Sequence, residues 1–228
     1  MLRRLLTAVG LGAAPETGAV VEPPYAPYPN DAINEIYNFL FCDELTAFKP
    51  RPGQSPAAWQ VTLFAEPADV SALSTLAGDA SQEGRVRYLA CTKLRQLGEA
   101  VPMKRLLGVI VEVPLESGLD VLAVYSEGGV RYINQTGKLA VFEGVASLQP
   151  HVQRLLAASE AVVTGIGPWR KPRRPPPKPG NMRLTFLTSD GLCFGEGPWS
   201  AMQREATAGP VIQRATDLLQ TVVRMAAQ

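Results

Sequence analysis

Four side chains of the 228-residue chain are of the types that usually hold a structural zinc ion: Cys42, Cys91, His151 and Cys193. A structural zinc site usually takes four Cys or His ligands in closely spaced pairs. These four are scattered along the chain, without a Cys-x-x-Cys or His-x-x-x-His pair. Each cysteine also lies beside apolar residues, which favours buried, unreactive thiols. We therefore predict no metal site and no cofactor.

His151 is the only histidine, so any Ser-His-Asp or Cys-His mechanism would have to use it. It follows Gln149-Pro150 at the predicted start of a helix, where the helix dipole disfavours a protonated imidazole. The sequence has no Gly-x-Ser-x-Gly elbow, and its glycine-rich stretch 191–197 lacks the Gly-Lys-Ser/Thr end of a phosphate-binding loop. We therefore predict no catalytic residues.

Carboxylates offer the remaining route to catalysis. Glu112 and Asp120 fall on neighbouring predicted strands, where Tyr125 or Tyr132 could support them. An inward Glu112 would have a raised pKa and could act as an acid or a base. Strand alternation favours an outward Glu112, because it stands between two valines. An enzyme with a pocket on the sheet is kept as an alternative, which an inward Glu112 in a concave pocket would favour and a filled sheet face would not.

Residues 168–180 (PWRKPRRPPPKPG), the basic segment, combine six prolines and five cations with no acid. This composition favours an extended, solvated polyproline II conformation that cannot join the core. The segment could dock in an SH3-type groove, on an anionic lipid surface or on nucleic acid, although five cations support only weak, non-specific phosphate binding. A solvated loop without a partner is the structural alternative. We predict another protein as the partner, contacted by Trp169, Arg170, Lys171, Arg173, Arg174 and Lys178.

The chain that must position these residues begins with a proline-rich stretch. Residues 1–29 show little periodicity and are predicted to form an extended, mobile arm. Its Tyr25 and Tyr28 either form a recognition motif or pack onto the protein itself, and we favour packing. Residues 1–14 have the outline of a signal peptide, but their apolar run is far shorter than the ~20 residues of a membrane-spanning helix. We prefer to interpret them as the frayed start of a cytoplasmic chain.

Residues 30–104 are predicted to form a mostly α-helical subdomain. Asn30 or Asp31 is a suitable N-cap for a helix whose apolar residues recur at helical spacing as far as Phe41. Glycine and proline break the pattern after it. Further helices are predicted over about 57–65, 68–77 and 81–98.

Residues 105–228 are predicted to form an antiparallel α+β domain. From Leu106 the pattern changes to β-branched runs separated by glycine turns, which is typical of a β-meander. A helix follows from about Leu148, Asp190-Gly191 marks a hairpin, and Pro210 lies near the start of a terminal helix. The fold class is therefore α+β: an N-terminal helical segment, then an antiparallel sheet with helices packed on one face and a wetter opposite face.

The stretch 130–143 (VRYINQTGKLAVFE), together with the Ser-Asp-Gly hairpin at 189–191 and the terminal helix, resembles a family of uncharacterised bacterial proteins with no assigned activity. The similarity covers mainly residues 106–228. It implies a bacterial, cytoplasmic origin and assigns no role to any residue.

The overall composition limits the classes of function. Lys and Arg number 22 against 21 Asp and Glu, and the net charge of +1 excludes a globally basic nucleic-acid binder. The odd number of cysteines favours a reducing compartment, and we predict the cytoplasm. The function that fits best is a soluble, non-catalytic binding or scaffold module. A structural subunit of a larger bacterial assembly is a further alternative, for which an exposed apolar patch on the last helix would be the sign.

Overall fold

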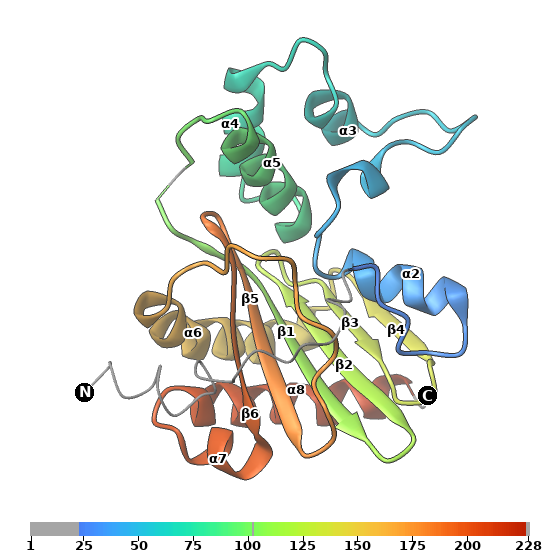
Figure 1. Ribbon diagram of the computed structural model, residues 1–228, viewed down its shortest axis with the longest axis vertical. Coiled ribbons are helices and arrows are strands. Elements are labelled where there is room, and N and C mark those ends of the chain that lie inside the picture. The colour runs from blue at the N-terminus through green and yellow to red at the C-terminus, as the bar shows by residue number, and fades with distance from the viewer. Residues whose placement is uncertain (1–22, 102, 227–228) are drawn as a thin grey trace, which may run out of the picture.

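The computed structural model describes residues 23–101 and 103–226 and confirms the predicted α+β class (Figure 1). Within these residues the strands are β1 (Leu106–Leu115), β2 (Gly118–Tyr125), β3 (Val130–Ile133), β4 (Leu139–Phe142), β5 (Asn181–Thr188) and β6 (Gly191–Pro198). They form one antiparallel sheet in the order β4-β3-β2-β1-β5-β6. The predicted meander is therefore β1 to β4, and the later hairpin extends the sheet beside β1.

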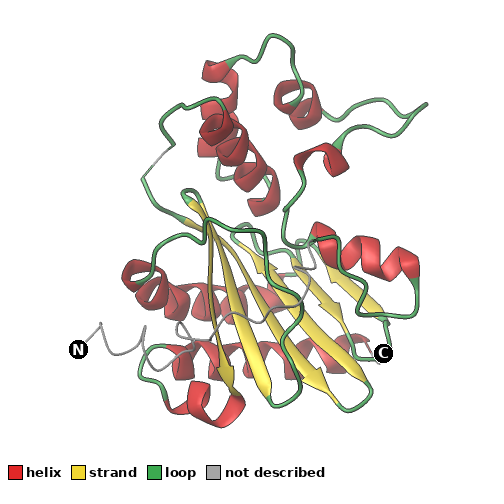
Figure 2. Ribbon diagram, in the orientation of Figure 1, coloured by secondary structure: helices red, strands yellow, loops and turns green. Residues whose placement is uncertain are grey.

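Helices precede the sheet in the chain and also follow its first four strands (Figure 2). Asn30 caps the first described helix, as predicted, by accepting hydrogen bonds from the backbone N–H groups of Ala32 and Ile33. Before the sheet lie α2 (Asp31–Phe39), the 3₁₀ helix η1 (Leu45–Phe48), α3 (Ala58–Leu63), α4 (Val70–Gly78) and α5 (Gly84–Gln96). After β4 lie the 3₁₀ helix η2 (Ala146–Leu148), α6 (Gln149–Gly165), α7 (Trp199–Arg204) and α8 (Ala208–Ala226).

The helices α6, α7 and α8 cover one face of the sheet, as predicted (Figure 1). Val109 of β1 and Phe186 of β5 are fully buried on this face. They belong to the same apolar cluster as Leu155 of α6, Met202 of α7 and Leu218 of α8. The strong amphipathic spacing of the last helix is thus explained by its contact with the sheet.

The opposite face, here called the second face, is not wet, so that part of the prediction is wrong. Ile110, Val121 and Tyr125 are fully buried on it. They share an apolar cluster with Leu40, which caps the C-terminus of α2, and with Leu94 of α5. The covering residues come from far earlier in the chain, so alternation within a strand could not reveal them. The segments predicted as a helical subdomain and an α+β domain therefore share this core.

The described part of the arm, residues 23–29, also lies against the second face. Tyr25 and Tyr28 are 5% and 4% exposed, which confirms the prediction that their rings pack onto the protein. The Tyr28 hydroxyl donates a hydrogen bond to the carbonyl of Leu119 at 2.9 Å. Residues 1–14, with the outline of a signal peptide, lie outside the described residues. In the described ranges, no helix is long and apolar enough to cross a membrane.

Candidate functional site

The basic segment, 168–180, joins α6 to β5 and crosses the second face of the sheet (Figure 1). The prediction of a solvated loop unable to join the core is wrong for Arg173 and Pro177, which are buried, while most of the other residues of the segment are exposed. It has no helix or strand of its own. What holds it in place must therefore be contacts with the rest of the protein.

Side-chain donors hold the backbone of the basic segment. Proline supplies a backbone acceptor without a donor, so a proline-rich segment packed against a protein needs donors from elsewhere. Four successive carbonyls, those of residues 172–175, each accept one side-chain hydrogen bond. The donors are Trp169 Nε1 to Pro172 (2.9 Å), the Tyr25 hydroxyl to Arg173, and Arg183 Nη1 and Nη2 to Arg174 (3.0 Å) and Pro175 (2.5 Å).

Arg173, one of the predicted contact residues, is 5% exposed and anchors the basic segment to the region of α2. Its Nε donates to Asp43 Oδ2 at 2.7 Å, and its Nη2 donates to Asn38 Oδ1 at 2.9 Å. Nη1 donates to the Tyr37 hydroxyl at 3.2 Å, and the guanidinium lies 3.8 Å from the centroid of the Phe41 ring. Arg173 therefore faces the interior of the protein, where the prediction placed it at the surface.

Close to this anchor lie two buried ionisable side chains, Glu112 of β1 and Arg183 of β5. The Tyr37 hydroxyl donates to Glu112 Oε1 at 2.7 Å, and Arg183 Nη1 lies 3.5 Å from Oε2 without hydrogen-bonding to it. Arg183 also binds Glu196 at 2.7 Å. Burial raises the pKa of Glu112, although the charge of Arg183 and the hydrogen bond from Tyr37 oppose it. The prediction of an outward Glu112 is wrong, because it shares the covered second face with Ile110.

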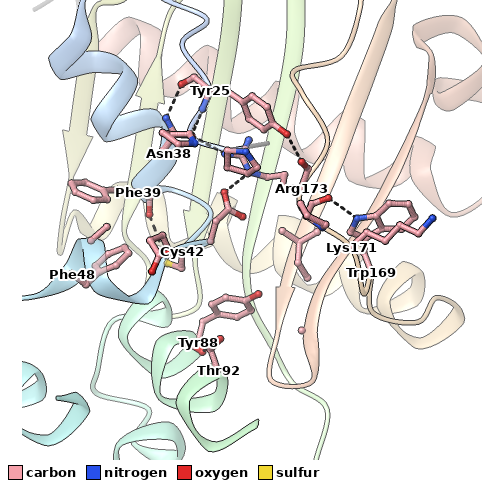
Figure 3. A pocket seen from close by; sticks show the side chains of 18 of the residues that line it. Tyr25, Asn38, Phe39, Cys42, Phe48, Tyr88, Thr92, Trp169, Lys171 and Arg173 are labelled. Atoms are coloured by element: carbon pink, nitrogen blue, oxygen red, sulfur yellow. Dashed lines mark hydrogen bonds and ion pairs between the residues drawn. The ribbon is translucent and has the colours of Figure 1, made fainter. Parts of the chain in front are cut away.

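A cavity of about 860 Å³, the large cavity, lies between α2, α5 and residues 169–173 (Figure 3). The Trp169 indole is fixed at its edge by Phe194, with the two ring centroids 5.1 Å apart in an edge-to-face arrangement. The hairpin turn between β5 and β6 closes one side. The aromatic side chains that line the cavity are Tyr25, Phe39, Phe48, Tyr88 and Trp169.

The structure divides the six predicted contact residues into two groups. Lys171 Nζ lies 5.9 Å from the centroid of the Trp169 ring, and both Arg170 and Lys171 are exposed at the edge of the large cavity. The members that line the cavity are Trp169, Arg170, Lys171 and Arg173, while Arg174 and Lys178 are exposed outside it.

Two polar side chains of the large cavity carry no signal in the sequence, since Tyr88 lies within an ordinary helical pattern and Asp43 follows the end of a helix. Tyr88 is 7% exposed, and its hydroxyl has no hydrogen-bond partner among the described residues. Burial raises the pKa of this hydroxyl. Burial also raises the pKa of Asp43, although Arg173 opposes it. Only the folded chain brings these two residues to one cavity.

The residues named for the enzymatic alternative do not meet at the large cavity. Glu112 does not line it, and the Tyr125 hydroxyl donates to the carbonyl of Leu40 at 3.0 Å. The Tyr132 hydroxyl donates to Asp120 at 3.0 Å beside a separate cavity of about 50 Å³ on the other face of the sheet. That volume holds only a few water molecules.

Of the three cysteines and the histidine, three lie away from the large cavity and one, Cys42, lines it. Cys42, Cys91 and Cys193 are buried free thiols, as predicted. Of the three, Cys42 lines the cavity, and burial raises its pKa far above the ordinary value of a thiol. His151 lies in the first turn of α6 and does not line the cavity. Among the described residues, no group of three or more His, Cys, Asp or Glu could hold a metal ion.

Comparison of the chain with protein-family models and with curated proteins finds no match. The candidate site is therefore defined by its geometry alone.

Proposed function

We propose that the protein is a non-catalytic binding module that holds a segment of another protein in the large cavity. The observation that carries this proposal is a site of about 860 Å³ lined by aromatic rings, with Arg170 and Lys171 exposed at its edge. Ligand sites commonly have volumes of roughly 300–1,000 Å³. Trp, Tyr and Arg are also the residue types enriched where proteins bind one another.

The anchoring of the basic segment supports a binding role. A flexible loop that becomes ordered on binding loses conformational entropy, about 0.5–1.5 kcal/mol for each immobilised side chain. Here Arg173 and Arg183 hold the backbone in place before any partner arrives. The side chain of Trp169 therefore has a fixed position at the large cavity before a partner binds. Because Arg173 is buried, fewer cations are available for phosphates than the sequence suggests, which favours a protein partner over nucleic acid.

No specific observation favours the two alternatives. Glu112, the first candidate acid or base of an enzyme, is covered by Tyr37 and lines neither cavity. Along the described part of α8, Val223 is the one large apolar side chain that is exposed. A single exposed valine is ordinary for a soluble domain and is much smaller than an interaction patch.

Selection from a random peptide library displayed on phage, with the full chain immobilised, tests the proposal. We expect enriched peptides, whose affinities are then measured in solution by fluorescence anisotropy. The double variant Arg170→Ser/Lys171→Ser should weaken their binding about tenfold at low salt, because both cations lie at the edge of the site. The matched control is Arg214→Ser/Arg224→Ser on α8, which should bind like the wild type. If no peptide is enriched, or if both variants bind like the wild type, the proposal is wrong.

A further inference from the structure

We propose, building on this proposed function, that the inner part of the large cavity is a cation subsite. Asp43 and Tyr88 would there receive the ammonium or guanidinium group of a Lys or Arg side chain from the bound segment. Two observations carry this inference: a pair of polar groups with acceptor capacity left, and two cavity cations that are already engaged within the protein.

The first polar group is the Tyr88 hydroxyl. Figure 3 shows the Tyr88 ring projecting from α5 among the side chains that line the cavity. The side chain is more than nine-tenths buried, yet no other residue in the described ranges hydrogen-bonds to the hydroxyl. The hydroxyl is reachable from the cavity, so a ligand can supply the partner that the protein does not. The oxygen can accept a hydrogen bond from a cationic N–H group.

The second polar group is the carboxylate of Asp43. Arg173 Nε donates to Oδ2 at 2.7 Å, and Oδ1 accepts no hydrogen bond from the described residues. The side chain is 20% exposed and therefore reachable from the cavity. An ionised carboxylate accepts about four hydrogen bonds, so Asp43 has acceptor capacity left for a ligand. Because Arg173 fixes its orientation, a ligand would not have to order it.

Two of the cations that line the cavity, Arg95 and Arg173, are already engaged within the protein, while Arg170 and Lys171 are exposed at its edge. A cation that already donates to carbonyls or hydroxyls has little left to offer an anionic ligand. The inner part of the cavity therefore keeps acceptor capacity at Asp43 Oδ1 and at the Tyr88 hydroxyl oxygen, which the N–H groups of a bound cation would satisfy. The engaged cations are Arg173, bound to Asp43, and Arg95, which donates to the Ser189 carbonyl and to Thr92 Oγ1 (2.7 Å) and lies 5.5 Å from the centroid of the Tyr88 ring.

Aromatic rings complete the subsite. Phe39 and Phe48 line the cavity on the α2 and η1 side, with their ring centroids 5.1 Å apart. Ring faces attract cations, and they also pack well against the alkyl stem of a Lys or Arg side chain. Glu44, which lines the same side, adds negative charge. A long side chain with an apolar stem and a cationic end matches this arrangement.

Titration of the ¹⁵N-labelled full chain, followed by NMR, tests the subsite with n-butylammonium as the probe. Butyrate is the anionic control and n-butanol the neutral one. We expect butylammonium to shift the amide resonances of Asp43 and Tyr88 saturably, with a dissociation constant on the order of millimolar for so small a ligand. Butanol should bind more weakly, and butyrate should leave these resonances in place.

The variant Tyr88→Phe removes only the unpartnered hydroxyl. We expect it to weaken butylammonium binding roughly threefold to tenfold, which corresponds to the net free energy of one ordinary hydrogen bond. The matched control is Tyr132→Phe, whose hydroxyl lies at the small cavity on the other face, and it should bind like the wild type. Tighter binding of butyrate than of butylammonium, or unchanged affinity in Tyr88→Phe, would overturn the subsite.

The selected peptides separate failure of the subsite from failure of the binding module. Replacing each Lys and Arg of a selected peptide by norleucine should weaken its binding to the wild-type protein. The same replacement should have a smaller effect on binding to the Tyr88→Phe variant. Peptides that bind equally well after this replacement would contradict the subsite while leaving the binding module in place. A library without any enriched peptide would contradict the module itself.

Discussion

Tyr37 joins the two parts of the buried polar network. Its hydroxyl donates to Glu112 at 2.7 Å and accepts from Arg173 at 3.2 Å. Both partners are buried ionisable groups, so neither can turn to water if the hydroxyl is lost. Leaving such a group without a partner costs more free energy than the hydrogen bond contributes when it is made.

The same substitution at two tyrosines measures this contribution. Tyr37→Phe should lower the free energy of unfolding by about 2–4 kcal/mol, because Glu112 and Arg173 each lose a partner. Tyr88→Phe should change it by less than about 0.5 kcal/mol, because its hydroxyl has no partner to lose. Urea unfolding followed by circular dichroism gives both values. Similar losses in the two variants would contradict the assignment of their hydrogen bonds.

Single residues are where prediction from the sequence was weakest, for a physical reason. Trp169 and Arg170 are predicted contact residues because of their types, and the structure places both at the large cavity. The predictions of an outward Glu112 and an exposed Arg173 are wrong, because the burial of a side chain depends on which residues cover it. Both side chains contact Tyr37, which lies far from them in the sequence.

At the scale of elements, the basic segment is ordered without any regular backbone hydrogen bonding. The carbonyls of residues 172–175 accept hydrogen bonds from three side chains: Tyr25 of the arm, Trp169 of the basic segment itself, and Arg183 of β5. Arg183 alone supplies two of these hydrogen bonds while it also binds Glu196. The conformation of the segment therefore depends on a few side chains, and local opening should follow their removal.

Limited digestion with trypsin tests this dependence. Arg183→Gln should expose the Arg170–Lys171 and Arg173–Arg174 bonds and increase their cleavage about tenfold or more, since protease access reports local opening. Circular dichroism shows whether the rest of the chain remains folded. Tyr25→Phe, which removes the hydrogen bond from the Tyr25 hydroxyl to the Arg173 carbonyl, should give a smaller increase. Unchanged cleavage in both variants would show that other contacts hold the segment.

The regular elements could be predicted well because their signals are local. Periodicity predicts a terminal helix with Pro210 near its start, and α8 begins at Ala208. The Asp190-Gly191 signal marks the turn between β5 and β6, whose last ladder pair is Thr188 with Gly191. The pairing of β5 with β1 is not local, because it depends on contacts across the whole sheet. The position of the basic segment follows from that pairing and could not be predicted either.

At the scale of the whole molecule, one sheet separates two apolar cores. The N-terminal segment fills the core on the second face, and α6, α7 and α8 fill the core on the first. Every central strand contributes alternate side chains to both cores, for example Val109 and Ile110 of β1. Loss of either core would expose one face of the same strands. We therefore expect the two segments to unfold together.

A pair of matched core substitutions tests this cooperativity. Leu94 of α5 and Leu155 of α6 are both fully buried, one in each core. Leu94→Ala and Leu155→Ala should each lower the free energy of unfolding by about 2–5 kcal/mol, because each leaves a cavity. In a cooperative molecule, both shift a single calorimetric transition whose calorimetric and van't Hoff enthalpies agree. If Leu94→Ala moved only the first of two transitions, the helical segment would unfold on its own, and the large cavity between α5 and the basic segment would be lost before the sheet.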